Sequence, residues 1–384
     1  MDSPKKIIAS TFLLIAFAMI LTLASCAQRS KVQWVSPYDE IDWNYIIQAK
    51  SLFHCHTSHS DGFYSPHVVV DHYHKLGFDV LALTDHWIVT YPWQEFSNLE
   101  VSERTFRRLD EGDLDDVPHE KTFVYEDRNP DELGMLAIMG SEPSPTGKGI
   151  HHLASLFSDV TGVGMDYEDM LKAIGDDGGL LSFAHPGRRT ERNNNELEDY
   201  IYYFEKYPHI YGIDIFNTST FGEPDRYPYT KELYAGLLKH FGSPGDEGWR
   251  PVWLTSTDDF HRYGQENQAF QIQLLNAFDQ DNVYNSLVDG AFFWIAKEQY
   301  TDEPVIKSID FDRTSITVNG TGYDEVSWYF NNEIIHTGET FDFFEHGSED
   351  VFYVYFLAHT SDFSIEERRG ALLGSQPIWI TTSP

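Results

Sequence analysis

The sequence is poor in cysteine and in basic residues. Its 384 residues include 2 cysteines, and 27 lysines and arginines stand against 61 aspartates and glutamates, which gives a formal net charge of −34 at pH 7. So few thiols exclude a structural zinc site of the four-cysteine type. An acidic balance of this size repels nucleic acid duplexes over most of the surface. The 41% of hydrophobic residues is enough to bury a large core, which excludes a disordered chain.

Two common catalytic motifs are also missing. The chain has no glycine-rich phosphate loop of the P-loop kind and no Gly-x-Ser-x-Gly elbow. A serine nucleophile presented on such an elbow is therefore excluded, and any hydrolytic chemistry must use another nucleophile.

The first 25 residues have the pattern of an export signal. A basic pair precedes an apolar run over 7–23, which ends in Leu23-Ala24-Ser25-Cys26. These four residues resemble a bacterial lipobox, in which the cysteine is lipidated and becomes the first residue of the mature chain. The run is also close to the shortest membrane span, so a simple N-terminal anchor is the alternative. We expect a lipoprotein signal peptide over 1–25, a tether over 26–40 and no internal disulfide once Cys26 carries lipid.

The expected location follows from this signal. Lipid on Cys26 would hold the chain to a membrane of the cell envelope, on the periplasmic or outer-surface side. Ala27 favours the outer membrane, by resemblance to the sorting rules of double-membraned bacteria. The partners we expect are this membrane and a small molecule, with no nucleic acid duplex.

The rest of the chain divides into a long α/β part and a short β part. Over 41–300, short apolar runs that predict strands alternate with helix-like stretches, which is the α/β pattern. In one such unit Ser65 suits the N-cap of a helix that Gly77 ends. Over 301–384, alternating segments between Asn-Gly and Gly-rich turns predict a small antiparallel β-sandwich. A charged insertion over 87–139 has no role that the sequence assigns.

Histidines and carboxylates follow the predicted strands. Residues i and i+2 of an extended segment point to the same side, so His54 and His56 can reach one ion while Cys55 faces away as a small buried filler. In a barrel of parallel strands such positions meet at the carboxyl ends. Imidazoles mixed with carboxylates suit Zn²⁺, Mn²⁺ or Fe²⁺. Further groups of this kind are Asp61, Asp85-His86, Glu142, His151-His152, His185 and Asp258-Asp259-Phe260-His261.

In this order the motifs resemble those of the polymerase and histidinol phosphatase (PHP) domain family. The resemblance spans about 51–261 and implies a distorted seven-stranded β/α barrel of the TIM type, with a trailing β-sandwich as in the exported branch of the family. A segment at 212–217 is also similar, but it carries Asp214 where glutamate is usual, so we leave Asp214 out of the site. The motifs are His54-Cys55-His56, Ser60-Asp61-Gly62, Thr84-Asp85-His86, Gly140-Ser141-Glu142, Ala184-His185-Pro186 and Asp259-Phe260-His261.

The resemblance implies two or three divalent metal ions. The first would be held by His54, His56, Glu142 and Asp259. Glu142 would bridge to a second, completed by His185 and one of the pair His151-His152. Asp61, His86 and His261 would hold a third. Of the pair we favour His151, because the family histidine is followed by one residue and then an apolar one, and we expect His152 to be structural because strand alternation lets only one face the centre.

The implied reaction is hydrolysis of a phosphoester by water bound to these ions. We expect Asp85 and Asp258 either to protonate the leaving group or, as the stronger expectation, to orient His86 and His261. Arg188 is a candidate contact for a substrate anion, with an ordinary surface position as the alternative.

Two other functions remain open. The same hydroxide can attack a carbamate, an amide or a carboxylic ester, and amidohydrolase barrels also open with His-x-His. The closing Asp-x-His pattern and the lack of a clear bridging lysine favour the phosphoesterase. The third possibility is a lipoprotein that binds a glycan or a partner through the sandwich, with the barrel as a scaffold.

Overall fold

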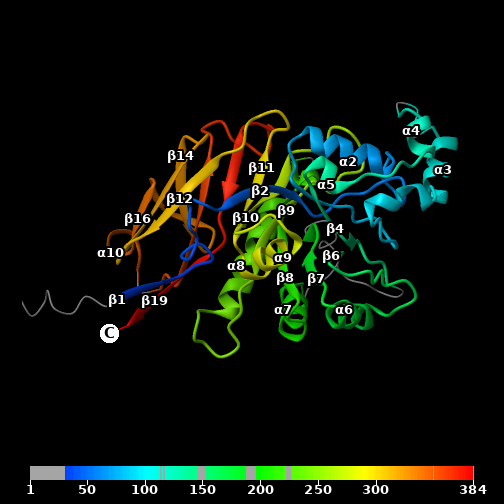
Figure 1. The fold of residues 1–384 in the computed structure, drawn as a ribbon. Helices are drawn as coiled ribbons and strands as arrows, with labels where there is room; N and C mark the ends of the chain where they lie inside the picture. The colour runs from blue at the N-terminus through cyan, green and yellow to red at the C-terminus, as the bar shows by residue number, and fades with distance from the viewer. Residues whose placement is uncertain are drawn as a thin grey trace, which may run out of the picture.

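The molecule is a mixed α/β fold built on three sheets (Figure 1). The computed structural model describes residues 31–112, 115, 117–145, 152–186, 196–221, 226–348 and 350–383. The signal peptide and the lipidation of Cys26 that we expect lie outside these residues. None of the helices in the described ranges has the length and the apolar character of a membrane span. The prediction of an α/β fold is confirmed.

The largest sheet joins both parts of the chain. Its order is β1-β19-β17-β18-β11-β10-β2-β3-β4, and β14 pairs with both β15 and β17. Neighbours pair in parallel from β2 to β4 and antiparallel elsewhere. The strands are β1 (Lys31–Val35), β2 (Ile47–Leu52), β3 (Val80–Ala82), β4 (Leu136–Ile138), β10 (Ala269–Leu275), β11 (Phe292–Lys297), β14 (Glu325–Phe330), β15 (Glu333–Thr337), β17 (Tyr353–His359), β18 (Ala371–Gly374) and β19 (Ile378–Ser383).

A second sheet has the order β5-β6-β7-β8-β9. Its strands are β5 (Gly140–Ser141), β6 (Leu153–Leu156), β7 (Leu180–Phe183), β8 (Ile210–Asn217) and β9 (Trp253–Thr257). β7, β8 and β9 are parallel, whereas β6 runs antiparallel to both of its neighbours. Every residue from β6 to β9 within the strands is buried, which is typical of strands covered on both faces. The longer helices of this half are α6 (Tyr167–Asp176), α7 (Glu196–Lys206), α8 (Arg226–Phe241) and α9 (Gln280–Asp289).

The strand pairings of the described residues do not close the seven-stranded barrel that the resemblance implies. The backbone ladder is interrupted at two places between the two sheets. At one of them the Ser256 hydroxyl on β9 donates to the carbonyl of Phe270 on β10 over 2.5 Å and accepts from the backbone N–H of Ile295 over 3.2 Å. At the other, a single bridge joins His86 to Glu142. Side chains and a lone bridge thus take the place of continuous backbone pairing.

The segment over 301–384 is antiparallel β structure, but its hydrogen bonds continue into the large sheet. Only β12 (Val305–Phe311), β13 (Ser315–Thr321) and β16 (Thr340–Asp342) form a separate three-stranded sheet. Trp328 of β14 packs against Phe341 of β16 and Phe356 of β17, with ring centroids 5.4 Å away in both cases. The two sheets therefore share an apolar core, while β18 pairs with β11 of the long α/β part.

The expectation of a tether over 26–40 is wrong for residues 31–35. These form β1, which pairs antiparallel with β19 along its whole length. The indole of Trp34 donates to the carbonyl of Asp312 over 2.7 Å. Buried Tyr38 then donates to the carbonyl of Phe292 and accepts from the backbone N–H of Gln376. The alternating side chains and the open edge of β19 make an added strand more stable than a solvated linker.

The charged insertion over 87–139 contains η1 (Trp93–Asn98), α3 (Glu103–Asp110), α4 (Glu120–Phe123) and α5 (Pro130–Leu133). In this insertion, α3 and α4 lie at the end of the molecule opposite to β1 and β16 (Figure 1). The preceding helix α2 (Pro66–Lys75) begins after Ser65 as predicted, although the Ser65 hydroxyl donates to the carbonyl of Lys121 instead of capping the helix. This hydrogen bond attaches the insertion to the start of α2, the helix that follows His54 and His56.

Candidate metal centre

Residues that follow strands of both sheets meet at one edge of the fold. His54 and His56 come after β2, and Cys55 between them bridges Phe260, so this stretch is extended as predicted. Cys55 is fully buried in the apolar core, which confirms its role as a filler. The other side chains of the edge come after β3 (His86), β5 (Glu142), β7 (His185) and β9 (Asp259 and His261).

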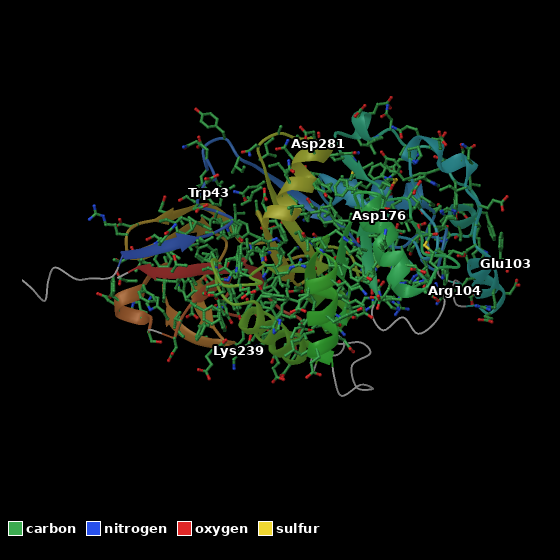
Figure 2. All side chains as sticks on the ribbon, turned by 90° about the horizontal axis from the view of Figure 1, so that it is seen from below. Trp43, Glu103, Arg104, Asp176, Lys239 and Asp281 are labelled. Atoms are coloured by element: carbon green, nitrogen blue, oxygen red, sulfur yellow. The ribbon has the colours of Figure 1, made fainter. Side chains whose placement is uncertain are left out.

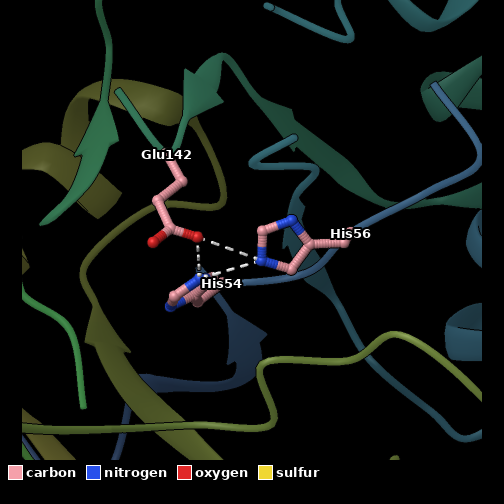
Figure 3. A group of neighbouring side chains, drawn as sticks. All are labelled: His54, His56 and Glu142. Atoms are coloured by element: carbon pink, nitrogen blue, oxygen red, sulfur yellow. Dashed lines mark hydrogen bonds and ion pairs between the residues drawn. The ribbon is translucent and has the colours of Figure 1, made fainter. Parts of the chain in front are cut away.

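His54 and His56 point to one carboxylate oxygen of Glu142 (Figure 3). Their Nε2 atoms lie 3.1 Å apart, and 3.1 and 3.2 Å from Glu142 Oε2. Asp259 Oδ1 lies 3.4 Å from His54 Nε2 and 3.2 Å from His56 Nε2. Nitrogen and oxygen ligands bound about 2.0–2.1 Å from a tetrahedral ion are roughly 3.3–3.4 Å from one another. The spacing of the His54, His56 and Glu142 atoms therefore fits three ligands of a single ion, and Asp259 lies beside both histidines.

The charges of this group also fit a cation. Burial by itself lowers the pKa of His56, but hydrogen bonds with Asp259 and Glu142 outweigh it and raise the pKa well above its usual value. Burial raises the pKa of Glu142, but hydrogen bonds with His152, His54 and His56 outweigh it and hold the pKa well below its usual value. The buried carboxylates thus require positive charge beside them. A divalent ion would supply that charge in place of the imidazole protons.

A second group surrounds the other oxygen of Glu142. His152 Nδ1 contacts Glu142 Oε1, and His185 Nε2 lies 3.8 Å from the same oxygen. His185 is buried, and its Nε2 has no hydrogen-bond partner within the described part of the chain. Burial lowers the pKa of His185 to about 3, so the imidazole is neutral, which is the form that binds metals. An orphaned buried nitrogen between two acidic groups indicates a missing ligand such as an ion.

A third group is centred on Asp61. Asp61 Oδ1 lies 3.5 Å from His56 Nδ1 and 3.4 Å from His261 Nε2, and Asp61 Oδ2 lies 3.6 Å from His86 Nε2. Burial lowers the pKa of His86 to about 4, so this ring is also neutral. The turn that returns Asp61 to the edge needs glycine at residue 62, because a Cβ there would lie 2.5 Å from the carbonyl oxygen of His56.

Every predicted ligand that the structure describes belongs to one of these groups. Neighbouring groups share His54, His56, Glu142, His185 or Asp259, so together they form one continuous cluster. The sets of three with ligand atoms within 4.8 Å of one another are His54-His56-Glu142, His54-His185-Asp259, His56-Asp61-His86, His56-Asp259-His261 and Glu142-His152-His185.

The choice within the pair His151-His152 is corrected in part. His151 lies outside the described residues, whereas His152, which we expect to be structural, contacts Glu142 in the second group. The reason is the direction of β6. Because β6 runs antiparallel to β5 and β7, the residue that precedes it lies at the same edge as the residues that follow its neighbours.

Asp85 holds the loop between His56 and Asp61 and does not orient the ring of His86. Its buried carboxylate accepts from the backbone N–H and the hydroxyl of Thr57, both over 2.7 Å, and from the hydroxyls of Ser60 and Thr90, both over 2.5 Å. With its lone pairs occupied in this way, Asp85 is poorly suited to protonate a leaving group. The loop it holds carries Asp61.

Asp85→Asn should therefore loosen this loop. An amide nitrogen in place of one oxygen would face donors, so we expect the melting temperature to fall by several degrees, because one buried donor loses its acceptor at a cost of about 1–3 kcal/mol. Thermal unfolding and bound metal per chain are the measurements. Asp110→Asn, at an exposed position of α3, is the matched control. An Asp85→Asn protein with the stability and metal content of the control would contradict this role.

Asp258 likewise holds backbone and does not orient His261. It accepts from the backbone N–H groups of Asn267, Gln268 and Ala269 over 2.7, 2.9 and 2.8 Å, and from the hydroxyl of Tyr73 over 2.9 Å. Burial raises its pKa to about 6. The His261 ring instead lies 2.8 Å from the carbonyl oxygen of Asp259, through Nδ1.

Asp214, which we left out of the site, holds the backbone of His185 in place. Its carboxylate accepts from the backbone N–H of His185 over 3.1 Å and from the hydroxyls of Thr255 and Thr257.

His185 and Asp259 both have positive φ, 33° and 49°, a conformation that costs energy for residues other than glycine and is often found at functional sites. Arg188 lies outside the described residues.

Two arginines of α3 adjoin the cluster but were not among the residues predicted from the sequence. Arg104 Nη1 lies 3.0 Å from Asp61 Oδ2, and the Arg108 guanidinium donates to the backbone carbonyl of Asp61. Figure 2 shows Arg104 beside Glu103 on α3, in the insertion to which we assigned no role. The spacing of four residues, which puts both side chains on one helix face, is the signal that could have pointed to them.

Comparison with known proteins adds little to this geometry. No family model and no curated protein matches the chain. A two-domain protein from Bacteroides vulgatus, described as containing a predicted PHP-like metal-dependent phosphoesterase, is 16% identical with a TM-score of 0.48, over 93% of this chain and 99% of its own. A protein from Bifidobacterium adolescentis, described as a candidate metal-dependent phosphoesterase, is 15% identical with a TM-score of 0.34, over 62% of this chain and 96% of its own. The function has to be argued from the site itself.

Proposed function

We propose that the protein is a metal-dependent hydrolase of the PHP type that cleaves phosphoesters. The observation that carries the proposal is the buried group of His54, His56 and Glu142, whose ligand atoms all lie within 4.8 Å of one another, with Asp259 Oδ1 within 3.4 Å of both histidine nitrogens. When bound, divalent ions such as Zn²⁺, Mn²⁺ or Fe²⁺ make hydroxide available near neutral pH and neutralise charge on a reacting phosphoryl group. Two or three ions would be held by the overlapping groups of the cluster.

The residues around these ligands have positioning roles in the proposal. Asp85 and Asp258 hold the loops that carry Asp61 and Asp259, and Asp214 holds the backbone of His185. Such support fixes the ligands before any ion binds, so little conformational entropy remains to be lost. Arg104 offsets the negative charge of Asp61 at the mouth of the site.

The proposal extends to the barrel. The two sheets would act together as a distorted seven-stranded barrel, with the Ser256 hydroxyl and the bridge from His86 to Glu142 in place of backbone ladders. The backbone ladder between the two sheets would stop at these two places because His86 and Glu142 serve as metal ligands at one of them and the Ser256 hydroxyl takes the backbone hydrogen bonds at the other.

Export and lipid attachment also belong to the proposal. The basic pair, the apolar run over 7–23 and Cys26 support a lipoprotein of the cell envelope. β1 begins five residues after this cysteine and lies at the end of the molecule opposite to α3 and α4 (Figure 1). A lipid on Cys26 would therefore attach the molecule by the end away from the insertion.

Release of p-nitrophenol tests the proposed reaction. The purified protein, supplied with Mn²⁺ or Zn²⁺, would be given p-nitrophenyl phosphate, bis(p-nitrophenyl) phosphate and p-nitrophenyl acetate. We expect metal-dependent turnover of at least one phosphoester and its loss in Glu142→Gln, since this substitution removes a carboxylate that two groups share. Turnover of the acetate alone would indicate that the site hydrolyses carbonyl compounds and not phosphoesters. A metal-loaded protein that cleaves none of the three substrates would overturn the proposal.

A further inference from the structure

A cavity of about 320 Å³ adjoins the metal cluster and is lined by arginines. Three of its lining residues, Asp61, Asp259 and His261, are expected ligands. The others that matter carry hydrogen-bond donors and lie on α3, at the end of β8 and in the loop after β9: Arg104, Arg108, Asn217, Ser219 and Arg262. Three aspartates, Asp61, Asp258 and Asp259, line the same cavity, so the three guanidinium groups balance its carboxylates in a chain whose formal charge is −34.

Asn217 presents a donor that lacks an acceptor. It is the last residue of β8 and is 2% exposed. Its Oδ1 accepts from the backbone N–H and the hydroxyl of Ser219, over 2.9 and 2.6 Å, which fixes the orientation of the amide. Across the described ranges, Nδ2 finds no hydrogen-bond partner. A buried amide donor in the wall of a cavity is normally satisfied, so this one indicates that a ligand supplies the acceptor.

Arg104 and Arg108 are held in place by the loop that carries Asp61 and Phe63. The Arg108 guanidinium lies over the ring of Phe63, 4.8 Å from its centroid, and donates to the Asp61 carbonyl. Arg104 contacts Asp61 through one terminal nitrogen, and a guanidinium carries five N–H donors in a planar fork. Arg262 is exposed in the cavity lining, and among the described residues no ion pair is recorded for it. Neutralisation of Asp61 therefore explains Arg104 but not Arg262 or the amide of Asn217.

We propose that this cavity binds a second anionic group of the substrate, a phosphate or a carboxylate, while the scissile phosphoester lies at the metal cluster. The inference rests on the proposed function and narrows it to phosphoesters with a further anion a few bonds from the ester. Arginine suits this task because its fork matches the paired oxygens of phosphate and carboxylate. The shared wall of Asp61, Asp259 and His261 places the two binding regions next to each other.

Matched substrates test the second anion. Phosphate release by the metal-loaded protein would be measured for bisphosphates of unbranched diols with three to six carbons, for alkyl monophosphates of the same lengths, and for the corresponding alkyl phosphates with a terminal carboxylate. We expect kcat/KM of the best bisphosphate or carboxylate series to exceed that of the monophosphate by about tenfold or more, mainly through KM, after correction for the two equivalent phosphates. The better of the two series identifies the anion.

Variants connect the preference to the cavity. Arg262→Gln and Asn217→Ala should each reduce the preference for the second anion by about fivefold or more. Arg107→Gln, on the same helix as Arg104 but outside the cavity lining, is the matched control and should keep the preference. Arg262 is exposed, so its variant keeps the test valid even where the Asn217 variant fails to fold.

The outcomes separate this inference from the proposed function. Equal kcat/KM for all three series, or a preference that both variants retain, would overturn the inference and leave the phosphoesterase intact. Absence of phosphate release from every series would instead overturn the proposed function on which the inference rests.

Discussion

Replacing His54 and His56 together by alanine should abolish phosphoester turnover. Both Nε2 atoms face the same oxygen of Glu142 and lie within 3.4 Å of Asp259, so the double variant removes half of the first ligand group. Loss of an ion that supplies both the nucleophile and charge stabilisation corresponds to several kcal/mol, or a fall in kcat/KM of roughly a thousandfold or more. Steady-state kinetics and elemental analysis of the bound metal are the measurements.

A histidine far from the cluster provides the control for this variant. His240 on α8 is exposed and paired with Glu205, and His240→Ala should keep both activity and metal. Circular dichroism establishes that the double variant is folded. Retention of wild-type metal content and turnover by a folded double variant would show that these histidines are not ligands.

Removal of the metal should lower the melting temperature by about 5 °C or more. The cluster buries Glu142, Asp259 and Asp61 close together, and a cation offsets their repulsion. A ligand present at 100 times its dissociation constant stabilises the native state by about 2.7 kcal/mol, which corresponds to several degrees for a chain of this class. Thermal unfolding before and after treatment with a chelator gives the shift, and added Zn²⁺ or Mn²⁺ should restore it.

The Glu142→Gln protein separates this effect from unspecific action of the chelator. Because Glu142 contributes to two of the ligand groups but not to the group centred on Asp61, the chelator should lower the melting temperature of the variant clearly less than that of the wild type. An equal shift in the wild type and the variant would assign the stabilisation to another site. An unchanged wild-type melting temperature, after proven loss of metal, would contradict a structural contribution of the ions.

The parts of the candidate site that were predictable are those governed by local rules. Alternation along a strand puts His54 and His56 on one side and Cys55 on the other whatever the rest of the fold does. The positions of His185 and Asp259 were also predictable, because each follows an apolar run whose end is visible in the local sequence. The α/β class follows from the same alternation of runs.

What was not predictable depends on strand direction and on partners distant in sequence. The sequence of β6 gives no sign that it runs antiparallel, and this direction alone brings His152 to the edge. Asp85 binds Thr57, and Asp258 binds the start of β10, so neither role follows from the adjacent histidine. β1 became a strand because β19 offers an open edge more than 340 residues later.

The metal content of the purified chain tests the central claim most directly. Elemental analysis of protein expressed without added chelator, and again after dialysis against Zn²⁺ or Mn²⁺, gives the number of ions bound per chain. We expect two or three divalent ions in the wild type and a clear loss in the variant that lacks His54 and His56. Less than one ion per chain after dialysis against either metal would contradict it.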